Sequence, residues 1–539
     1  MRLSRREMLS AILGTPLASA LAACEREPET AAIAGGFVEP SMEVGHRLRD
    51  AAPRDGDFEG APVTRTEVAI VGGGPAGLSA AWRLARAGRD FRLLELEPQC
   101  GGTSRSERDG GLRHPWGAHY ITTPLSDGGP LVELLDELGA LSREDARGRL
   151  GGQEELLVRE PKVRLFYRGY WYPGLYPRVG ASDDDLTQLA RFERRMAGFA
   201  ALRDGRGRRA FAIPVDASSD DPELTALDRI SATEWLKREG LTSTRLHWLL
   251  DHACRDDYGL TLEHTSAWAL IFYHASRMDP ARDNDADVLT WPEGNGALVA
   301  HLEGAAGGRI DTGQLVTTVV PEGDGVRVDA IDWRSGKARR VRARRAIMAA
   351  PRFIARRLVR AGLPAGSADF QYGAWLVANL HLRGRPRSRG HEDAWDNVLH
   401  DSPSLGYVSA THQRGRSFGP SVWTYFMPMV DGDARAGRKR LLEPSWQDYR
   451  DAVIADLARA HAELEPQVSR VDVCRWGHGM IQPRPGFIWG PSRWAAAQPV
   501  GPIHFAHSDL SGIALFEEAF HHGVRAADEV RAALKEGPT

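Results

Sequence analysis

The segment Gly72-Gly73-Gly74-Pro75-Ala76-Gly77 constrains the fold of this chain more than any other feature. It matches G-x-G-x-x-G, follows the apolar run TEVAIV and precedes an Ala/Leu-rich stretch that ends at Gly88. In such a strand–turn–helix unit, Gly72 permits a tight turn, Gly74 lets the backbone approach a pyrophosphate, and Gly77 allows close helix–strand packing. The free N–H groups of the helix N-terminus then face the phosphates. The sequence therefore predicts a dinucleotide site, without separating NAD from FAD.

An acidic residue is expected about twenty positions after such a turn, where its carboxylate accepts hydrogen bonds from the adenosine ribose. Glu95, at the end of the predicted strand FRLLELE, is our candidate, and Glu97 is its competitor. Gly101 and Gly102 follow Glu95 after five further residues. A strand that ends in Glu and is followed by a glycine pair at this spacing resembles the FAD-dependent amine oxidase and phytoene desaturase superfamily. The resemblance implies that this pair approaches the pyrophosphate and that the cofactor is FAD rather than NAD.

Three further segments resemble the cofactor-contacting parts of this superfamily. WGAHY (residues 116–120) is similar to the segment that passes the flavin ring, and LVTTV (315–319) to the one whose Val meets adenine through its backbone. HFAHSDLSGIALFEEAF (504–520) resembles the C-terminal flavin segment, which begins a helix whose dipole faces the flavin. The expected cofactor-binding residues are Gly72, Gly74, Gly77, Glu95, Gly101, Gly102, Arg105, Val316, Asp509 and Gly512.

Two of these assignments carry a qualification from the resemblance itself. Members of the superfamily often have Arg directly after the glycine pair, whereas Thr103 stands there in this chain, so Arg105 is the weaker phosphate candidate. Asp509 falls where the superfamily has an acidic residue near the ribityl chain and phosphates. Gly512 is expected at the start of the flavin-facing helix.

Predicted strands at both ends of the chain, with helical material between them, indicate domains built from non-contiguous segments. We expect an α/β protein in which an FAD-binding Rossmann-like domain carries an inserted α+β substrate domain. The expected FAD-binding segments are residues 66–125, 291–365 and 476–535. The expected substrate-domain segments are residues 126–290 and 366–475.

Catalytic residues are predicted from two places. His119 lies in the segment that the resemblance puts beside the flavin, where a His can move a proton or polarise a substrate; a structural His bonded to backbone is the alternative. Many amine oxidases of the superfamily hold a water near flavin N5 with a Lys on a substrate-domain strand, but no Lys occurs between Lys337 and Lys439. Period-two alternation along WLVANLHL puts Asn379 and His381 on one strand face. Either Asn379 or His381 would take the place of the Lys, or the enzyme does not need that water.

Composition excludes several other classes. The formal net charge is −3, without the concentrated basic surface that nucleic-acid binding needs. The four Cys include no CxxC pair, so no metal site is expected. No Cys follows Cys474, which excludes a cysteinyl link to flavin in the C-terminal segment. We therefore expect non-covalent FAD, with a histidyl link left open.

Residues 1–23 are predicted to be a bacterial export signal, and residues 24–65, rich in Pro, Glu, Ala and Gly, a tether. SRREML, with Arg5 and Arg6, resembles the twin-arginine motif, and LAAC resembles a lipobox that ends in a lipidated Cys24; an ordinary signal with a stray Cys is the alternative. We expect twin-arginine export and lipid anchoring through Cys24 on the periplasmic side of the envelope. Glu25, in place of Asp, favours the outer membrane.

These features predict an FAD-dependent oxidoreductase that takes a hydride from a small organic substrate, either an amine or a C–C bond. Because the Lys is missing, a dehydrogenase that passes electrons to a membrane quinone or another acceptor is favoured over an oxidase. Two alternatives stay open. One is a flavin-dependent isomerase without net redox, and the other is a non-catalytic flavin-binding envelope lipoprotein.

Overall fold

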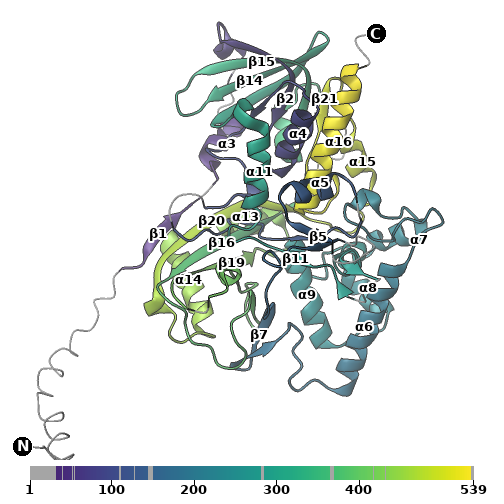
Figure 1. Ribbon diagram of the computed structural model, residues 1–539, viewed down its shortest axis with the longest axis vertical. Coiled ribbons are helices and arrows are strands. Elements are labelled where there is room, and N and C mark those ends of the chain that lie inside the picture. The colour runs from purple at the N-terminus through teal and green to yellow at the C-terminus, as the bar shows by residue number, and fades with distance from the viewer. Residues whose placement is uncertain are drawn as a thin grey trace, which may run out of the picture.

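The structure, a computed structural model, describes residues 32–38, 40–50, 53, 55–107, 111–126, 128–143, 150–280, 284–363, 369–416, 418–430 and 432–535. The expected export signal, with Arg5 and Arg6, and the expected lipid-bearing Cys24 lie outside these residues. The described chain forms two lobes, each built on its own large sheet (Figure 1). Over the described residues, no helix combines the length and apolar character needed to cross a bilayer.

The first lobe contains a seven-stranded sheet in the order β12-β3-β2-β15-β14-β13, with β21 paired to β15 (Figure 1). β12, β3, β2, β15 and β21 run parallel, and β13 and β14 form an antiparallel hairpin with β15. Strands from three separated parts of the chain thus share one sheet, and the predicted Rossmann-like α/β fold is confirmed. Its strands are β2 (Val63–Val71), β3 (Phe91–Leu94), β12 (Ile310–Asp311), β13 (Gln314–Glu322), β14 (Gly325–Asp332), β15 (Ala338–Met348) and β21 (Ile503–Phe505).

Two helices pack at close range on this sheet. A Cβ on Gly523 of α16 (Phe516–Lys535) would lie 2.2 Å from the Ala76 carbonyl oxygen of α4 (Pro75–Arg86). The C-terminal helix therefore touches the backbone of the helix that follows the glycine turn. The other helices of this lobe are α3 (Met42–Asp50), α5 (Pro130–Glu137), α11 (Gly296–Ala306), α12 (Arg352–Leu358) and α15 (Pro491–Ala497).

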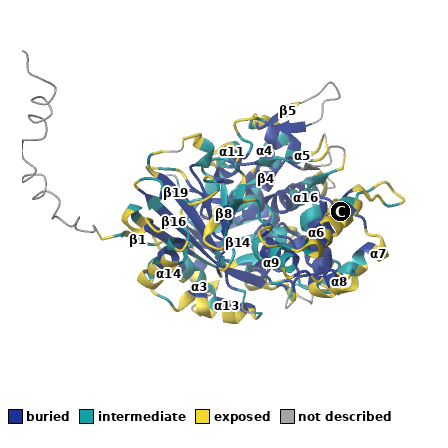
Figure 2. Ribbon diagram, turned by 90° about the horizontal axis from the view of Figure 1, so that it is seen from below, coloured by how far each residue is buried: buried dark blue, intermediate teal, exposed yellow. Residues whose placement is uncertain are grey.

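The second lobe contains an eight-stranded sheet in the order β1-β20-β16-β19-β18-β17-β7-β8. Its central strands are buried, and α13 (Ala434–Leu442) and α14 (Trp446–Ala458) pack on one face through a shared apolar cluster (Figure 2). β20 runs through the expected domain boundary at residue 475, so the substrate sheet extends further than predicted. The strands are β1 (Ala34–Phe37), β7 (Val163–Tyr167), β8 (Tyr170–Pro173), β16 (Tyr372–Leu382), β17 (Asp396–Leu399), β18 (Tyr407–Ser409), β19 (Ser421–Pro428) and β20 (Val468–Ile481).

A helical layer completes the second lobe beside this sheet (Figure 1). α10 is apolar on nearly every side and is buried by the helices around it. The helices are α6 (Asp183–Ala201), α7 (Pro222–Thr225), α8 (Ala232–Arg238), α9 (Thr244–Tyr258) and α10 (Ala267–Ala275). Short paired strands complete the chain: β4 (Ile121–Thr122), β5 (Leu141–Arg143), β6 (Leu150–Gly152), β9 (Met278–Asp279), β10 (Asn284–Asp285) and β11 (Val288–Leu289).

The N-terminal segment differs from the expected tether. β1 pairs in parallel with β20, with Ala34 opposite Arg470 and Phe37 opposite Val473. α3 follows and lies beside the first lobe (Figure 1). This close pairing is possible because residue 35 is a glycine, since a Cβ there would lie 1.9 Å from the Val471 carbonyl oxygen. The small residues that favour a tether on composition instead permit close pairing with the sheet edge.

Candidate active site

A cavity of about 510 Å³, here called the larger cavity, opens at the carboxyl ends of β2 and β3 and reaches β16 and β20 of the second lobe. Ligands of parallel sheets bind at this edge, where the loops after the strands meet. Among the expected cofactor residues, those lining it are Gly72, Gly74, Glu95, Gly102, Arg105 and Val316.

The glycine turn has the geometry that its pattern predicts. Gly72 has φ +105°, and a Cβ there would lie 2.7 Å from the Ala349 carbonyl oxygen. A Cβ on Gly77 would lie 1.8 Å from the Gly72 carbonyl oxygen. Gly74 is different, since a Cβ there meets no protein atom within 4 Å. The turn is packed against protein at Gly72 and Gly77, and at Gly74 it leaves room for a ligand.

Glu95 and Glu97 both line the larger cavity but are held differently. The Glu95 carboxylate accepts hydrogen bonds from the backbone N–H groups of Gly73 and Glu97, the latter at 2.7 Å. Burial raises the pKa of Glu95 to about 7. Glu97 accepts from the Ser41 N–H at 2.7 Å and the Ser41 hydroxyl at 3.0 Å. Glu95 is thus tied to the glycine turn itself, which is where the ribose-binding acid is expected.

The second glycine pair lies against the first turn. The Gly101 N–H donates to the Gly73 carbonyl at 2.8 Å, and a Cβ on Gly102 would lie 3.5 Å from Gly74 Cα. Arg105 lies behind the pair with its guanidinium 5.0 Å from the Trp476 ring, and its buried Nε has no hydrogen-bond partner in the protein. Arg105 lines the larger cavity, and a buried guanidinium N–H without a protein partner suits a phosphate oxygen.

The middle segment meets the cavity at a break in strand pairing. The register between β13 and β14 shifts between Val316 and Thr318. Gln314, Leu315 and Val316 line the larger cavity at this point. Because a bulge interrupts the ladder there, backbone groups next to Val316 are available to a ligand.

The C-terminal segment departs from expectation at two residues. Asp509 is buried away from the cavity, where it accepts from the Tyr372 hydroxyl at 2.5 Å and the Arg352 N–H at 2.8 Å and lies 2.6 Å from His507 Nδ1. Burial acts to raise the pKa of Asp509, but these three partners outweigh it and lower the pKa. His507 and Ser508 line the larger cavity instead.

Gly512 does not begin the flavin-facing helix. It has φ +76°, a turn conformation, and packs on Phe487, whereas α16 begins at Phe516. Ala514, Leu515, Phe516 and Glu517 line the larger cavity. The positive end of the helix dipole therefore faces the cavity as expected, but from a start four residues later in the chain.

A smaller cavity of about 240 Å³ adjoins the larger one. The two cavities share several lining residues, His119, Tyr120, Thr122, Asp256, Arg277 and Phe426. The smaller cavity is therefore the place where a substrate can meet a group bound in the larger one.

His119, the predicted catalytic residue, lines both cavities. Its ring stacks on Phe426 with centroids 5.1 Å apart, and Nδ1 lies 3.3 Å from the Gly117 carbonyl oxygen. Burial lowers the pKa of His119 to about 4, so the imidazole is neutral at pH 7. A neutral imidazole at this position can donate or accept a hydrogen bond, but it carries no positive charge.

Asn379 and His381 lie away from both cavities, which corrects the expectation that they replace the Lys. Asn379 is fully buried and donates to the Pro115 carbonyl at 3.1 Å. His381 Nε2 lies 3.3 Å from Asp472 Oδ2. The predicted strand face is the correct one, but the Pro115 segment covers it at residues 379–381. Trp375 and Val377, earlier on that face, line the larger cavity.

Sequence analysis did not identify two acidic residues that line the smaller cavity, Asp256 and Asp396. Burial raises the pKa of Asp256 to about 8, with repulsion from Asp257 and Asp396 adding to the effect, and burial raises the pKa of Asp396 to about 7. Arg277 opposes this, but it is held by Asp257 at 2.9 Å. The adjacent acids at the inner end of α9, on a helix whose buried face is otherwise mostly apolar, are the signal that could find them.

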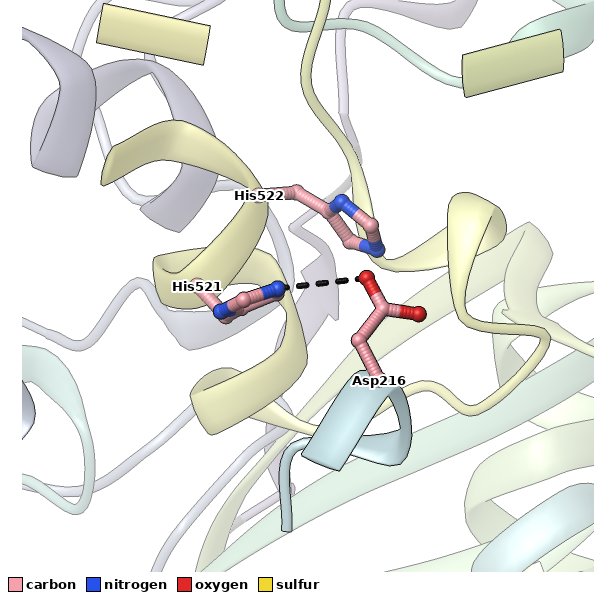
Figure 3. A group of neighbouring side chains, drawn as sticks. All are labelled: Asp216, His521 and His522. Atoms are coloured by element: carbon pink, nitrogen blue, oxygen red, sulfur yellow. Dashed lines mark hydrogen bonds and ion pairs between the residues drawn. The ribbon is translucent and has the colours of Figure 1, made fainter. Parts of the chain in front are cut away.

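Asp216, His521 and His522 form a separate cluster where α16 meets the turn Val215–Ala217 (Figure 3). Their potential ligand atoms lie within 4.8 Å of one another, and His521 Nε2 is 3.3 Å from Asp216 Oδ2. This spacing raises the question of a metal site, which no sequence motif predicts.

The partners of this cluster do not fit a metal. Arg525 Nε donates to His522 Nδ1 at 3.2 Å, and burial lowers the pKa of His522 well below its usual value. A neutral imidazole that accepts at Nδ1 carries its proton on Nε2, the atom nearest the cluster. Arg493 already pairs with Asp216 at 3.2 Å. The cluster is an ion-pair and hydrogen-bond network between the two lobes.

The comparison with known families is decided by a match over most of the chain. The family model for flavin-containing amine oxidoreductases matches residues 75–531. The chain belongs to the flavin-containing amine oxidoreductase family. It is an FAD-dependent oxidoreductase, and FAD is its cofactor. The open Gly74, the buried Arg105 N–H and the tethered Glu95 fit an FAD dinucleotide in the larger cavity.

Proteins similar to this chain differ in how much of it they cover. AofH of Mycobacterium tuberculosis (strain CDC 1551 / Oshkosh), which carries the name of a flavin-containing monoamine oxidase, is 25% identical over 503 residues, 88% of this chain and 98% of AofH. Putrescine oxidase of Kocuria rosea is 29% identical over 172 residues, 32% of this chain and 31% of that enzyme. Thiamine thiazole synthase of Aeropyrum pernix is 40% identical over 74 residues, and the chain spans only 23% of its length.

Solved structures show the same fold at low identity. Putrescine oxidase bound to putrescine has a TM-score of 0.65 at 20% identity, covering 87% of this chain and 100% of that one. Cyclohexylamine oxidase from Brevibacterium oxydans has a TM-score of 0.63 at 17% identity, covering 87% and 99%. A fatty acid isomerase from P. acnes has a TM-score of 0.62 at 16% identity, covering 86% and 98%.

The glycine turn yields a test that separates cofactor contact from folding. Gly74→Val is expected to fold and lose FAD, because its side chain meets no protein atom but enters the space of the pyrophosphate. Gly77→Val is expected to lower the melting temperature of the apoprotein, because the Cβ overlaps the Gly72 carbonyl. Gly304→Val, on α11 with open space, is the control. FAD released on denaturation and apoprotein melting are measured; retention of FAD by Gly74→Val contradicts the assignment.

Proposed function

We propose that this enzyme oxidises a primary or secondary amine that binds as a cation in the smaller cavity. The observation that carries the proposal is the pair of buried carboxyl groups, Asp256 and Asp396, beside the cofactor cavity. Buried carboxyl groups that repel one another favour a bound cation, since a positive charge restores their ionised form. The names of putrescine oxidase and of cyclohexylamine oxidase agree with an amine substrate.

The charges of the smaller cavity argue against an anionic substrate. His252 and His274 are neutral there, since burial lowers the pKa of each to about 3. Arg277 is neutralised by Asp257 at 2.9 Å. A fatty acid carboxylate would meet Asp256 and Asp396 without a free cation to receive it. A flavin-dependent isomerase that acts on a lipid is therefore the weaker hypothesis, although a fatty acid isomerase shares the fold.

The residues around the cavity can carry out the proton step of amine oxidation. FAD supplies a hydride acceptor. The ammonium group must first lose a proton, and the ionised carboxylate of Asp256 or Asp396, with pKa values of about 8 and 7, can receive it from an amine whose pKa is ~10. Loss of a hydride from the adjacent carbon then gives an iminium ion. Neutral His119 and the Phe426 ring bound the passage and help to exclude water.

We further propose a dehydrogenase that transfers electrons to a quinone or another acceptor of the envelope. Among the described residues that line the two cavities, the cations are Arg105 and Arg277, and neither is the Lys that many amine oxidases use near flavin N5. Export by the twin-arginine route and a lipid on Cys24 would place the enzyme beside such an acceptor. The missing Lys and the expected export signal are both features of the sequence.

The substrate proposal is tested by anaerobic bleaching of the flavin with amines, diamines, polyenes and fatty acids. Amines alone are expected to bleach it. Asp256→Asn and Asp396→Asn are each expected to raise KM by about 10- to 100-fold, the worth of a hydrogen bond to a charged group. Asp183→Asn, at the exposed start of α6, is the control. Bleaching by fatty acids with unchanged KM in both variants would refute the amine assignment.

The raised pKa values predict a pH dependence with a definite sign. Below about pH 7 both acids are protonated, and above about pH 8 both are ionised, so KM for a cationic amine should fall between pH 6 and 9. Because the folded-state pKa values lie above the usual 3.8, folding stability is lost as pH rises through them. Asp256→Asn should therefore melt higher than wild type at pH 9 and show a flatter KM profile. Parallel profiles would show that Asp256 does not bind the cation.

Electron transfer is tested by reducing the enzyme anaerobically and mixing it with oxygen or a soluble quinone in a stopped-flow instrument. Reoxidation by the quinone is expected to be faster, because no Lys-held water assists the reaction with oxygen. Faster reoxidation by oxygen would identify an oxidase.

Localisation is tested by cell fractionation of two variants. Arg5→Lys with Arg6→Lys should leave the protein cytoplasmic, and Cys24→Ala should yield an unlipidated form. Mass spectrometry of the N-terminal peptide measures the lipid. An unchanged mass and membrane fraction in Cys24→Ala would refute the lipobox.

A further inference from the structure

We propose that residues 32–38 and 40–50, here called the N-terminal strap, form part of the FAD site and hold the cofactor in the larger cavity. Pro40, Gly45 and Leu48 of the strap line that cavity. The family match begins at residue 75, so the strap lies outside it. The strap runs from β1 on the second lobe to α3 on the first, and so crosses between the lobes at the cavity (Figure 1).

One end of the strap is seated on the substrate sheet. β1 adds a parallel strand to the edge of β20, and the Val38 N–H donates to the Val473 carbonyl at 2.8 Å. This pairing requires a glycine at position 35, since a Cβ there would lie 1.9 Å from the Val471 carbonyl oxygen and the residue has φ +134°. Gly36, its neighbour, has open space around it. The seat therefore depends on Gly35 and not on Gly36.

The other end of the strap binds Glu97, an acidic residue of the cavity lining. Ser41 donates from its N–H and its hydroxyl to the two carboxylate oxygens of Glu97, at 2.7 and 3.0 Å. A carboxylate that receives two donors is fixed in place. Gly45 lies close to Leu96, with 3.7 Å between its would-be Cβ and Leu96 Cδ2. The strap thus closes over the loop that follows Glu95.

Arg105 lines the cavity and lies near both Val38 of the strap and Glu97, the residue that the strap binds. Its guanidinium donates to the Val38 carbonyl at 3.4 Å and lies 3.7 Å from Glu97. The same side chain lines the cavity and has a buried Nε with no hydrogen-bond partner in the protein. The strap therefore positions both the cation expected at the phosphates and the acid beside the ribose-binding Glu95.

This arrangement links cofactor release to the strap. Pro40, Gly45 and Leu48 are part of the cavity lining, so separation of the strap from the first lobe would open this side of the cavity. Any contact that favours the seated strap then slows FAD loss, and bound FAD in turn stabilises the seated strap, because linkage is reciprocal.

The test measures FAD dissociation from the full-length holoenzyme by the rise of flavin fluorescence after dilution. Gly35→Val and Ser41→Ala are each expected to release FAD about 10-fold faster than wild type, the size of one lost hydrogen bond to a charged group for Ser41. Gly36→Val is the matched control and is expected to release FAD at the wild-type rate. Limited proteolysis of the strap should be slower with FAD bound than without it.

Three results would overturn the proposal. The first is wild-type FAD release in both Gly35→Val and Ser41→Ala. The second is a lower melting temperature of the apoprotein in these variants without faster release, which would make the strap a structural brace only. The third is strap proteolysis that is independent of FAD. If Gly35→Val does not fold, Ser41→Ala and the proteolysis decide.

Discussion

Backbone-to-backbone contact around the glycine turn is the constraint on which the rest of the molecule depends. Gly72 brings β2 against the turn after β15, Gly77 brings α4 against β2, and Gly523 brings α16 against α4. These contacts join three parts of the chain that are far apart in sequence. A methyl group at any of the three positions would overlap a neighbouring atom. The cofactor cavity lies where these elements meet, and among Gly72, Gly74 and Gly77 it is Gly74 whose Cβ position is free of protein atoms.

The chemistry follows from burial of charge beside that cavity. Asp256 and Asp396 line the smaller cavity, where burial disfavours their ionised forms. Folding is weakened by such groups, and a cationic ligand recovers the lost free energy on binding. Arg277 with Asp257 keeps a balanced pair next to them. The proposed selectivity for amines therefore comes from an excess of acidic over basic side chains at the smaller cavity.

Much of the cofactor site could be predicted because its residues act through local backbone geometry. The glycine turn, Glu95 and the second glycine pair need only a short strand–turn–helix segment, and its sequence specifies it. The later residues are harder to place. Asp509 and Gly512 lie in the expected segment, but the cavity is lined by Ser508 in place of Asp509, and α16 begins at Phe516 rather than at Gly512. Asn379 lies on the expected strand face, yet another segment covers it.

The sequence by itself determined the α/β class, the dinucleotide turn and the interruption of the FAD-binding domain, because short-range patterns of glycine and apolar residues encode them. Only the tertiary structure decided the contents of the smaller cavity and the position of the N-terminal strap. Asp256 and Asp396 come from different elements, and their raised pKa values depend on burial by residues from across the chain. Residues 32–38 and 40–50 have the composition of a tether, yet Gly35 pairs with β20 and Ser41 binds Glu97. Such long-range contacts leave no periodic trace in the sequence.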